Sequence, residues 1–206
     1  MALYLGDKKV CPTLTIEKTI PSMKAFFEAG GKCANSTAQS FEGCWQPSDS
    51  KNVTDMYKMF SNCSSLTAIP QLDTSKVTDM NSMFYECSKL TAIPQLDTSN
   101  VTNMSSMFSN CFKLTTIPQL DTSNVTNMNY MLSRCSSLTA IHMINIKTNL
   151  DISSSTKFTR EALVEIIGNL KAQTSGYKTL TMGSTNLAKL TDEDKAVATG
   201  KGWTLA

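Results

Sequence analysis

One 24-residue unit occurs four times in succession between residues 53 and 146, and it limits the fold more strongly than any other feature of the sequence. The copies follow one another without insertion, so each position has an equivalent 24 residues away. Self-similarity at a fixed period of this length is the signature of a solenoid, in which each repeat buries its apolar side against its neighbours. The apolar positions that all copies share are Val53, Met56, Met59, Cys63, Leu66 and Ile69 with their equivalents.

Each unit divides into a strand-like part and a helix-like part. Residues 66–72 have strand character, although Pro70 removes one main-chain donor from them. The polar triplet Asp73-Thr74-Ser75 then predicts a turn. Apolar residues next recur at i, i+3, i+4 and i+7, the spacing of one face of a short helix. They are Met80, Met83, Phe84 and Cys87.

The spacing Cys-x-x-Leu-x-x-Ile, followed by Val-Thr-x-Met-x-x-Met-Phe-x-x-Cys, resembles the methionine-rich branch of the BspA-like leucine-rich repeats. The fourth copy departs from it at Leu132, which replaces phenylalanine, and at Ile141–Ile144, which replaces Ile-Pro-Gln-Leu. The resemblance implies an α/β fold, namely a right-handed leucine-rich repeat solenoid with parallel short strands, short convex helices, and N- and C-terminal caps. It also implies an adhesion or attachment role outside the cell, on a bacterial surface or a phage virion.

Two segments precede the repeats. Leu3–Leu5 and Val10–Cys11 flank Gly6-Asp7-Lys8-Lys9, which predicts a β-hairpin in residues 1–14. In residues 15–52 an apolar stripe that includes Phe26 predicts a helix, and the stretch from Trp45 to Asn52 resembles a degenerate coil that caps the array.

Residues 147–206 follow the repeats and form a strand–helix–strand–helix–strand pattern. We expect this tail to continue the coil and seal its open end. Thr159 begins the first predicted helix and Thr191 the second, each with acidic residues in its first turn. The predicted elements are a strand over Ile144–Ile146 at the junction with the repeats, a helix over 159–170, a strand over 177–182, a helix from 191 to about 199 and a strand over 203–205.

Four of the seven cysteines are repeat positions, one in each copy. A row with one cysteine per coil is more typical of buried small apolar side chains than of disulfide bridges, because parallel side chains meet the torsion requirement of a bridge poorly. Outside the repeats, Cys33 and Cys44 could be bridged in an oxidising compartment or remain free thiols. The sequence leaves both states open.

Several functional classes are disfavoured by the sequence. The single histidine, His142, has no catalytic partner in the pattern, and no cysteine pair has zinc spacing, so we predict no catalytic residue, no metal and no cofactor. A net charge of +2 gives no reason to expect nucleic acid. No apolar run approaches the length needed for membrane insertion, and the first nine residues lack the pattern of a secretory signal.

One acidic row invites two interpretations. Asp73, Asp97 and Asp121 occupy equivalent positions, and coils stacked about 4.8 Å apart would align their carboxylates. They could form a ladder for cations, or each could accept hydrogen bonds within its own Asp-Thr-Ser turn. We favour the turn.

The remaining candidate for function is the solvent-facing side of the strands, where threonine and glutamine recur from coil to coil. Such a surface suits a protein or glycan partner, and its uniformity suits a repetitive one. The alternative is a structural spacer that docks into an assembly through its terminal segments, with the N-terminal hairpin as one contact. The candidate binding residues are Thr67, Gln71, Thr91, Gln95, Thr115, Gln119, Thr139 and His142.

Overall fold

The structure is a computed structural model that describes residues 3–5, 8–10 and 50–206. The predicted helix around Phe26, the cap at Trp45 and the Cys33–Cys44 pair lie outside these residues. Near the N-terminus, β1 (Leu3–Leu5) pairs antiparallel with β2 (Lys8–Val10), so the predicted hairpin is present, but Lys8 and Lys9 lie in the second strand and not in the turn.

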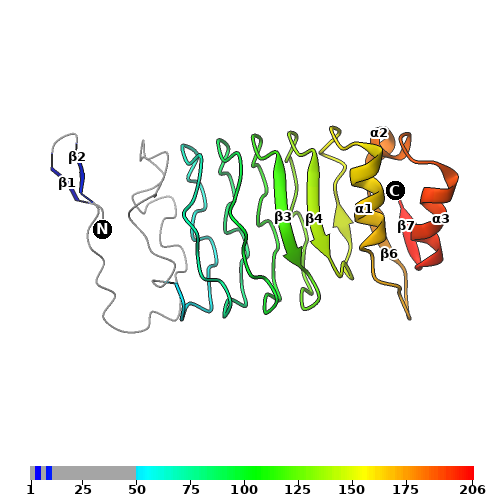
Figure 1. Ribbon diagram of the computed structural model, residues 1–206, viewed down its shortest axis with the longest axis horizontal. Coiled ribbons are helices and arrows are strands. Elements are labelled where there is room, and N and C mark those ends of the chain that lie inside the picture. Colours follow the sequence, from blue (N-terminus) through cyan, green and yellow to red (C-terminus); the bar gives the residue numbers. More distant parts are fainter. Residues whose placement is uncertain (1–2, 6–7, 11–49) are drawn as a thin grey trace.

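The four repeats lie side by side as coils stacked along the long axis of the molecule (Figure 1). Equivalent positions of neighbouring coils form parallel main-chain bridges, beginning with Asp55 to Asp79 and continuing through Asn103 to Asn127. The chain is therefore a mixed α/β molecule in which parallel pairing follows the 24-residue period.

Extended strands form only from the third repeat onward. β3 (Thr116–Asp121) and β4 (Ala140–Ile144) are parallel, with a shift in register between Ile117 and Leu120. The prediction of strands over residues 66–72 and 90–96 is wrong. Each of those segments contains a proline and faces another in the next coil, so donors are missing on both sides, whereas β4 carries His142 at the equivalent position.

The segment from methionine to cysteine in each repeat consists of turns, so the prediction of short convex helices in the repeats is wrong. The amide of Met59 bonds the carbonyl of Met56 at 3.2 Å, while the amide of Phe60 bonds the carbonyl of Met83 in the next coil at 2.9 Å. An α-helix is about 10 Å wide with its side chains. On the turn side, direct main-chain bonds between neighbouring coils, such as that from Phe60 to Met83, hold the coils at about the 4.8 Å spacing of strands, which leaves no room for a helix in each coil.

These turns require left-handed backbone at two positions in every coil. The φ angles there lie between 54° and 64°, although none of the residues is glycine. A positive φ at the third position of a four-residue turn is the geometry of a type II turn. The residues are Lys58, Asn62, Ser82, Glu86, Ser106, Asn110, Tyr130 and Arg134.

The core is a set of side-chain rows that run through the stack. Phe60, Phe84 and Phe108 are buried with ring centroids 5.5 Å apart and rings nearly parallel. Beside them, the buried thiol of Cys87 donates to the carbonyl of Phe60 at 3.1 Å, and Cys111 and Cys135 repeat this bond one coil further on. The four repeat cysteines are buried thiols rather than members of disulfide bridges, as predicted.

The tail adds a parallel three-stranded sheet in the order β5-β6-β7 and three helices. Both predicted helices and the last two predicted strands are present. α2 and β5 were not predicted, because they are short and α2 begins without a side-chain cap. The elements are β5 (Leu150–Asp151), α1 (Arg160–Gly168), β6 (Lys178–Thr181), α2 (Gly183–Leu187), α3 (Asp192–Gly200) and β7 (Trp203–Leu205).

Polar contacts fix the tail helices to each other and to the stack. The Arg160 guanidinium on α1 makes two 2.8 Å hydrogen bonds to the carboxylate of Asp194 on α3. Asp194 also completes a capping box with Thr191. At the other end of α1, the Lys201 ammonium donates to the carbonyls of Ile167 and Gly168, which a helix leaves unpaired. Within the described part of the chain, no helix has the length and apolar character needed to cross a membrane.

Candidate functional site

The predicted threonines and glutamines form two surface rows on one side of the stack, which we call the strand face. All are exposed except Thr67, which is half-buried. The hydroxyls of Thr91, Thr115 and Thr139 each donate to the main chain of the preceding coil, as in the 3.1 Å bond from Thr139 Oγ1 to the carbonyl of Thr115. The strand face consists of Thr67, Gln71, Thr91, Gln95, Thr115, Gln119 and Thr139.

Two of the three glutamines, Gln71 and Gln95, are also bonded within the stack. Gln71 Nε2 donates to the carbonyl of Leu72 at 3.1 Å and to that of Gln95 in the next coil at 2.7 Å. Gln95 bonds Leu96 and Gln119 in the same way. The side-chain donors of this face therefore help to hold the coils together, and the face offers a ligand mainly oxygen acceptors.

His142 does not join these rows. It occupies the proline position of its coil, and its Nδ1 lies 2.7 Å from Glu165 Oε1 on α1. Both side chains are about half exposed. The contact links the last repeat to the tail.

The acidic row is explained by its own turns. Asp73 Oδ1 accepts hydrogen bonds from the hydroxyl of Ser75 at 2.7 Å and from its amide at 3.1 Å, and these bonds lower the pKa of Asp73. Asp97 makes the same pair of bonds with Ser99. The turn interpretation is confirmed. Among the described residues, no group of three acidic, histidine or cysteine side chains is placed to hold a metal ion.

The repeat thiols are unsuited to chemistry at neutral pH. Burial raises the pKa of Cys135 to about 12, although a hydrogen bond to Cys111 opposes the shift. Burial, together with the neighbouring thiols of Cys87 and Cys135, raises the pKa of Cys111 well above its ordinary value. A buried thiol without a thiolate form is a poor nucleophile, which supports a packing role.

A second surface, which the sequence argument missed, lies over the methionine-to-cysteine turns. Its left-handed positions hold serine or asparagine at four of eight places and a larger side chain at the other four, namely Lys58, Glu86, Tyr130 and Arg134. A hydrogen bond with Glu86 raises the pKa of Tyr85, while the charges of Arg134 and Lys58 oppose the shift. These side chains therefore influence one another across three coils. We call Lys58, Tyr85, Glu86, Tyr130 and Arg134 the turn face.

Departure from the repeat is the signal that could have found the turn face. Most outward positions are nearly constant from coil to coil, whereas these carry tyrosine, lysine, glutamate and arginine. Tyr130 is the most conspicuous of these residues, because it is 73% exposed to solvent.

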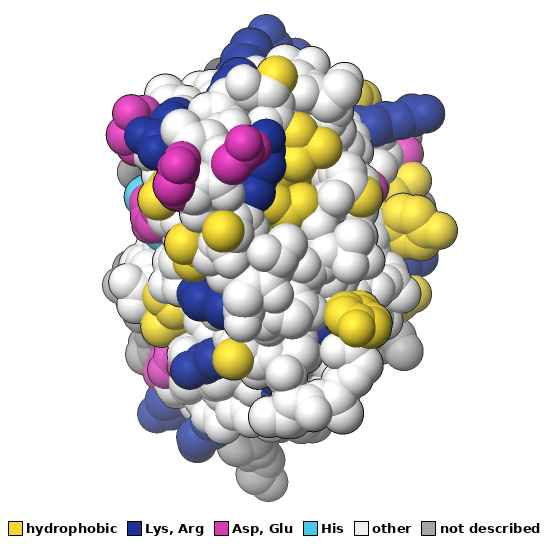
Figure 2. Space-filling view, turned by 90° about the vertical axis from the view of Figure 1, so that its right-hand side faces the viewer, with side chains coloured by type: hydrophobic (Ala, Val, Ile, Leu, Met, Phe, Trp, Pro, Cys, Tyr) yellow, Lys and Arg dark blue, Asp and Glu magenta, His cyan; other side chains and the backbone are white. Residues whose placement is uncertain are grey.

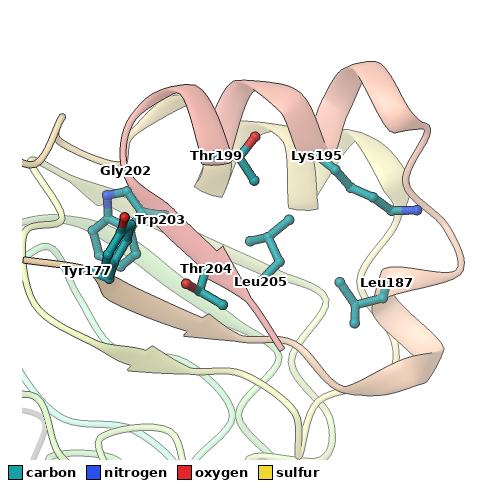
Figure 3. Close-up of a pocket in the computed structure, with 8 residues that line it drawn as sticks. All are labelled: Tyr177, Leu187, Lys195, Thr199, Gly202, Trp203, Thr204 and Leu205. Carbon is teal, nitrogen blue, oxygen red and sulfur yellow. The ribbon is translucent and has the colours of Figure 1, made fainter.

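A third feature is a pocket of about 580 Å³ at the C-terminal end of the stack. Figure 3 shows Thr199 and Leu205 between α3 and β7, with Leu187 of α2 at one side and Tyr177 near Trp203. Seen end-on, this face has hydrophobic side chains gathered beside a charged margin (Figure 2). The tail contributes buried residues to the core at this end, and the pocket opens beside β7, the outer strand of its sheet.

Comparisons with known proteins place the chain in a family. A crystal structure of a leucine-rich repeat protein from T. pallidum is similar, with 14% sequence identity and a TM-score of 0.47, over 76% of this chain and 69% of that one. No curated protein gives a significant match. Residues 21–144, more than half of the chain, match the family described as "Mycoplasma protein of unknown function, DUF285". The chain belongs to the DUF285 family.

Proposed function

We propose that this chain is a non-enzymatic binding module that serves adhesion on a bacterial surface or a phage virion. Its repeats would belong to the methionine-rich, BspA-like branch of the leucine-rich repeats and wind as a right-handed solenoid. The four in-register copies of the motif support this assignment. A stack held by main-chain bonds at every coil is also a rigid platform, which suits binding better than a flexible chain does.

The observation that carries the proposal is the composition of the turn face. Tyrosine and arginine are the residues most often found at the energetic centre of protein interfaces. Here Tyr130 and Arg134 lie in the same coil, both exposed and both in left-handed backbone. A left-handed conformation costs a non-glycine residue about 1–2 kcal/mol. Ser82, Ser106, Asn62 and Asn110 occupy equivalent positions in the same conformation, so folding alone does not require the larger side chains.

The charges of the turn face define the partner we expect. Lys58 and Arg134 supply two positive charges, and Glu86 is bonded to Tyr85. A protein surface with exposed carboxylates beside an apolar area would complement this arrangement, since arginine binds a carboxylate with two parallel hydrogen bonds.

The strand face is the second candidate contact, and its partner would be a glycan. Its amide and hydroxyl donors are bonded to the stack, which leaves a regular array of oxygen acceptors at the surface. Sugar hydroxyls could donate to such an array. A structural spacer remains the alternative to both, because side chains bonded within the stack contribute rigidity without any ligand.

Replacing each turn-face residue by the residue that other coils carry at that position tests the proposal. The variant is Lys58→Ser, Tyr85→Ser, Glu86→Asn, Tyr130→Ser and Arg134→Asn, and these residues already occur in the same backbone conformation or the same row. Binding would be measured on arrays of immobilised human extracellular-matrix proteins and of mammalian glycans. We expect binding of the unaltered chain to a matrix protein, and a loss of about tenfold or more in the variant.

The matched control replaces Gln71, Gln95 and Gln119 by alanine. The proposal is supported if this control still binds the matrix protein and the turn-face variant does not. The opposite result would move the site to the strand face. Failure of the unaltered chain to bind either array would contradict the adhesion role and favour the spacer.

A further inference from the structure

The outer edge of β7 has unpaired main-chain groups. The amide of Ala206 bonds the carbonyl of Leu180 on β6 at 3.2 Å, and the carbonyl of Ala206 accepts from the amide of Met182. Alternate residues of a strand direct their main-chain groups to opposite sides. Trp203 and Leu205 therefore direct theirs away from β6, and among the described residues these groups have no hydrogen-bond partner.

An apolar hollow accompanies this edge. The pocket beside β7 is lined by Leu187 and Leu205, and Tyr177 at its margin is 85% exposed. An unpaired strand edge next to an apolar pocket is the arrangement used in β-strand addition. Main-chain bonds supply affinity in that mode, and the pocket receives an alternate side chain of the added strand.

The same chain contains a sheet of only two strands among the described residues. β1 and β2 pair there with each other and with no third strand, and each has three residues, the same length as β7. A two-stranded hairpin is marginally stable alone in water and gains stability from a further strand.

The surroundings of the pocket carry both signs of charge. Lys195 lines the pocket and lies 3.5 Å from Asp192, whose side chain is 99% exposed, and Glu193 beside Asp192 is also exposed. The hairpin strand β2 contains Lys8 and Lys9, and the carboxylates of Asp192 and Glu193 would attract them at the margin of a contact.

We propose that the free edge of β7 and its pocket seat the N-terminal hairpin of a second copy of this chain, so that copies join head to tail. Hairpin and seat are different surfaces, so the contact is heterologous. Such contacts generate rings or open chains, because each copy keeps one hairpin and one seat to offer. This assembly contact is separate from the turn face and does not depend on the binding partner proposed above.

Sedimentation velocity of the full chain, over about two decades of concentration, tests the contact. We expect the average mass to rise above that of the monomer as concentration increases, and to fall again as salt is added. Two variants should weaken the association about tenfold or more. One lacks residues 1–10, and the other carries Thr199→Arg, which fills the pocket from an exposed position on α3. Ser136→Arg, an exposed change in the fourth repeat, is the matched control and should assemble normally.

A mixing experiment separates a head-to-tail contact from any other association. The deletion variant keeps an intact seat and Thr199→Arg keeps an intact hairpin, so an equimolar mixture should form a one-to-one dimer and nothing larger. Circular dichroism melting curves of both variants establish that they are folded. A full chain that stays monomeric at all concentrations, assembly that persists in either variant, or variants that do not pair when mixed would each overturn the proposal. If deletion of residues 1–10 lowered the melting temperature of a chain that does not assemble, the hairpin would pack within its own chain, and this result would also overturn the proposal.

Discussion

Replacement of Phe84 measures how much the row of stacked rings contributes to stability. Phe84 is fully buried and has a parallel ring 5.5 Å away on each side. Truncating a buried phenylalanine to alanine costs about 3–5 kcal/mol, so Phe84→Ala should lower the free energy of unfolding by that amount. Phe84→Leu retains most of the apolar volume but loses two ring pairs, each contributing about 0.5–1.5 kcal/mol.

Phe108 provides an internal comparison. Its ring stacks on that of Phe84, whereas the next coil has Leu132 at the equivalent position. Phe108→Leu therefore removes one ring pair and should cost about half as much as Phe84→Leu, that is, about 0.5–1.5 kcal/mol.

Urea unfolding followed by far-ultraviolet circular dichroism gives these free energies, provided that the dependence on urea is the same in all variants. Repeat stacks can unfold in parts, so unchanged cooperativity is the control. Equal costs for Phe84→Leu and Phe108→Leu would show that ring stacking adds nothing to apolar burial. A cost of less than about 1 kcal/mol for Phe84→Ala would refute the close packing of the row.

Three further predictions concern other parts of the molecule. Tyr130→Gly relieves left-handed backbone (φ 58°), so in urea unfolding it should leave the free energy of unfolding unchanged or raise it by up to about 1 kcal/mol. The neighbouring Asn129→Gly should instead lower the free energy of unfolding by about 0.5–1 kcal/mol. A lower free energy of unfolding in both variants contradicts the backbone argument. Cys63, Cys87, Cys111 and Cys135 should resist iodoacetamide at pH about 8 in the native protein and react in urea, as peptide mass mapping would record, because burial suppresses the thiolate. Hydrogen bonds from Arg160 and Thr191 lower the pKa of Asp194 in the folded protein. The ionised carboxylate of Asp194 therefore stabilises the folded state fully above the unfolded pKa of about 4, and this stabilisation is lost as pH falls through the lower folded pKa. Asp194→Asn should therefore lower the urea midpoint at neutral pH and have little effect in strong acid, and an equal loss at both pH values would disprove the linkage.

The buried rows could be predicted from the sequence because a period is a property of the sequence itself. Every shared apolar position of the four repeats is buried, including the cysteines. The choice between helix and turn could not be predicted in the same way. Apolar residues at Met80, Met83, Phe84 and Cys87 face inward in either case, and what excludes the helix is the distance to the next coil. Asparagine at Asn62 and Asn110 was a local hint, because asparagine tolerates left-handed backbone better than most residues.

The candidate sites, too, could be predicted from the sequence only in part. Exposure of the threonine and glutamine rows followed from the alternation of side chains along a strand. Their bonds to the neighbouring coil did not, because the bond from Gln71 to Gln95 depends on how closely two coils approach. The turn face was not predicted, because the sequence argument used the positions that the four repeats share, and Tyr130 is at a position where they differ. The free edge of β7 could not be predicted from the presence of the tail elements, because it depends on their order in the sheet.

The main-chain bonds between coils also bear on how the length of this molecule can change over generations. Every repeat meets the next through the same bonds, so a junction made by deleting or duplicating one whole 24-residue unit repeats a junction that already exists. Insertion of a single residue would instead displace one coil against all those that follow it. Recombination between near-identical repeats can therefore lengthen or shorten the rod in steps of one coil at little cost in stability. Gain or loss of repeats would then set the distance between any groups attached at the two ends of the rod, in steps of one coil.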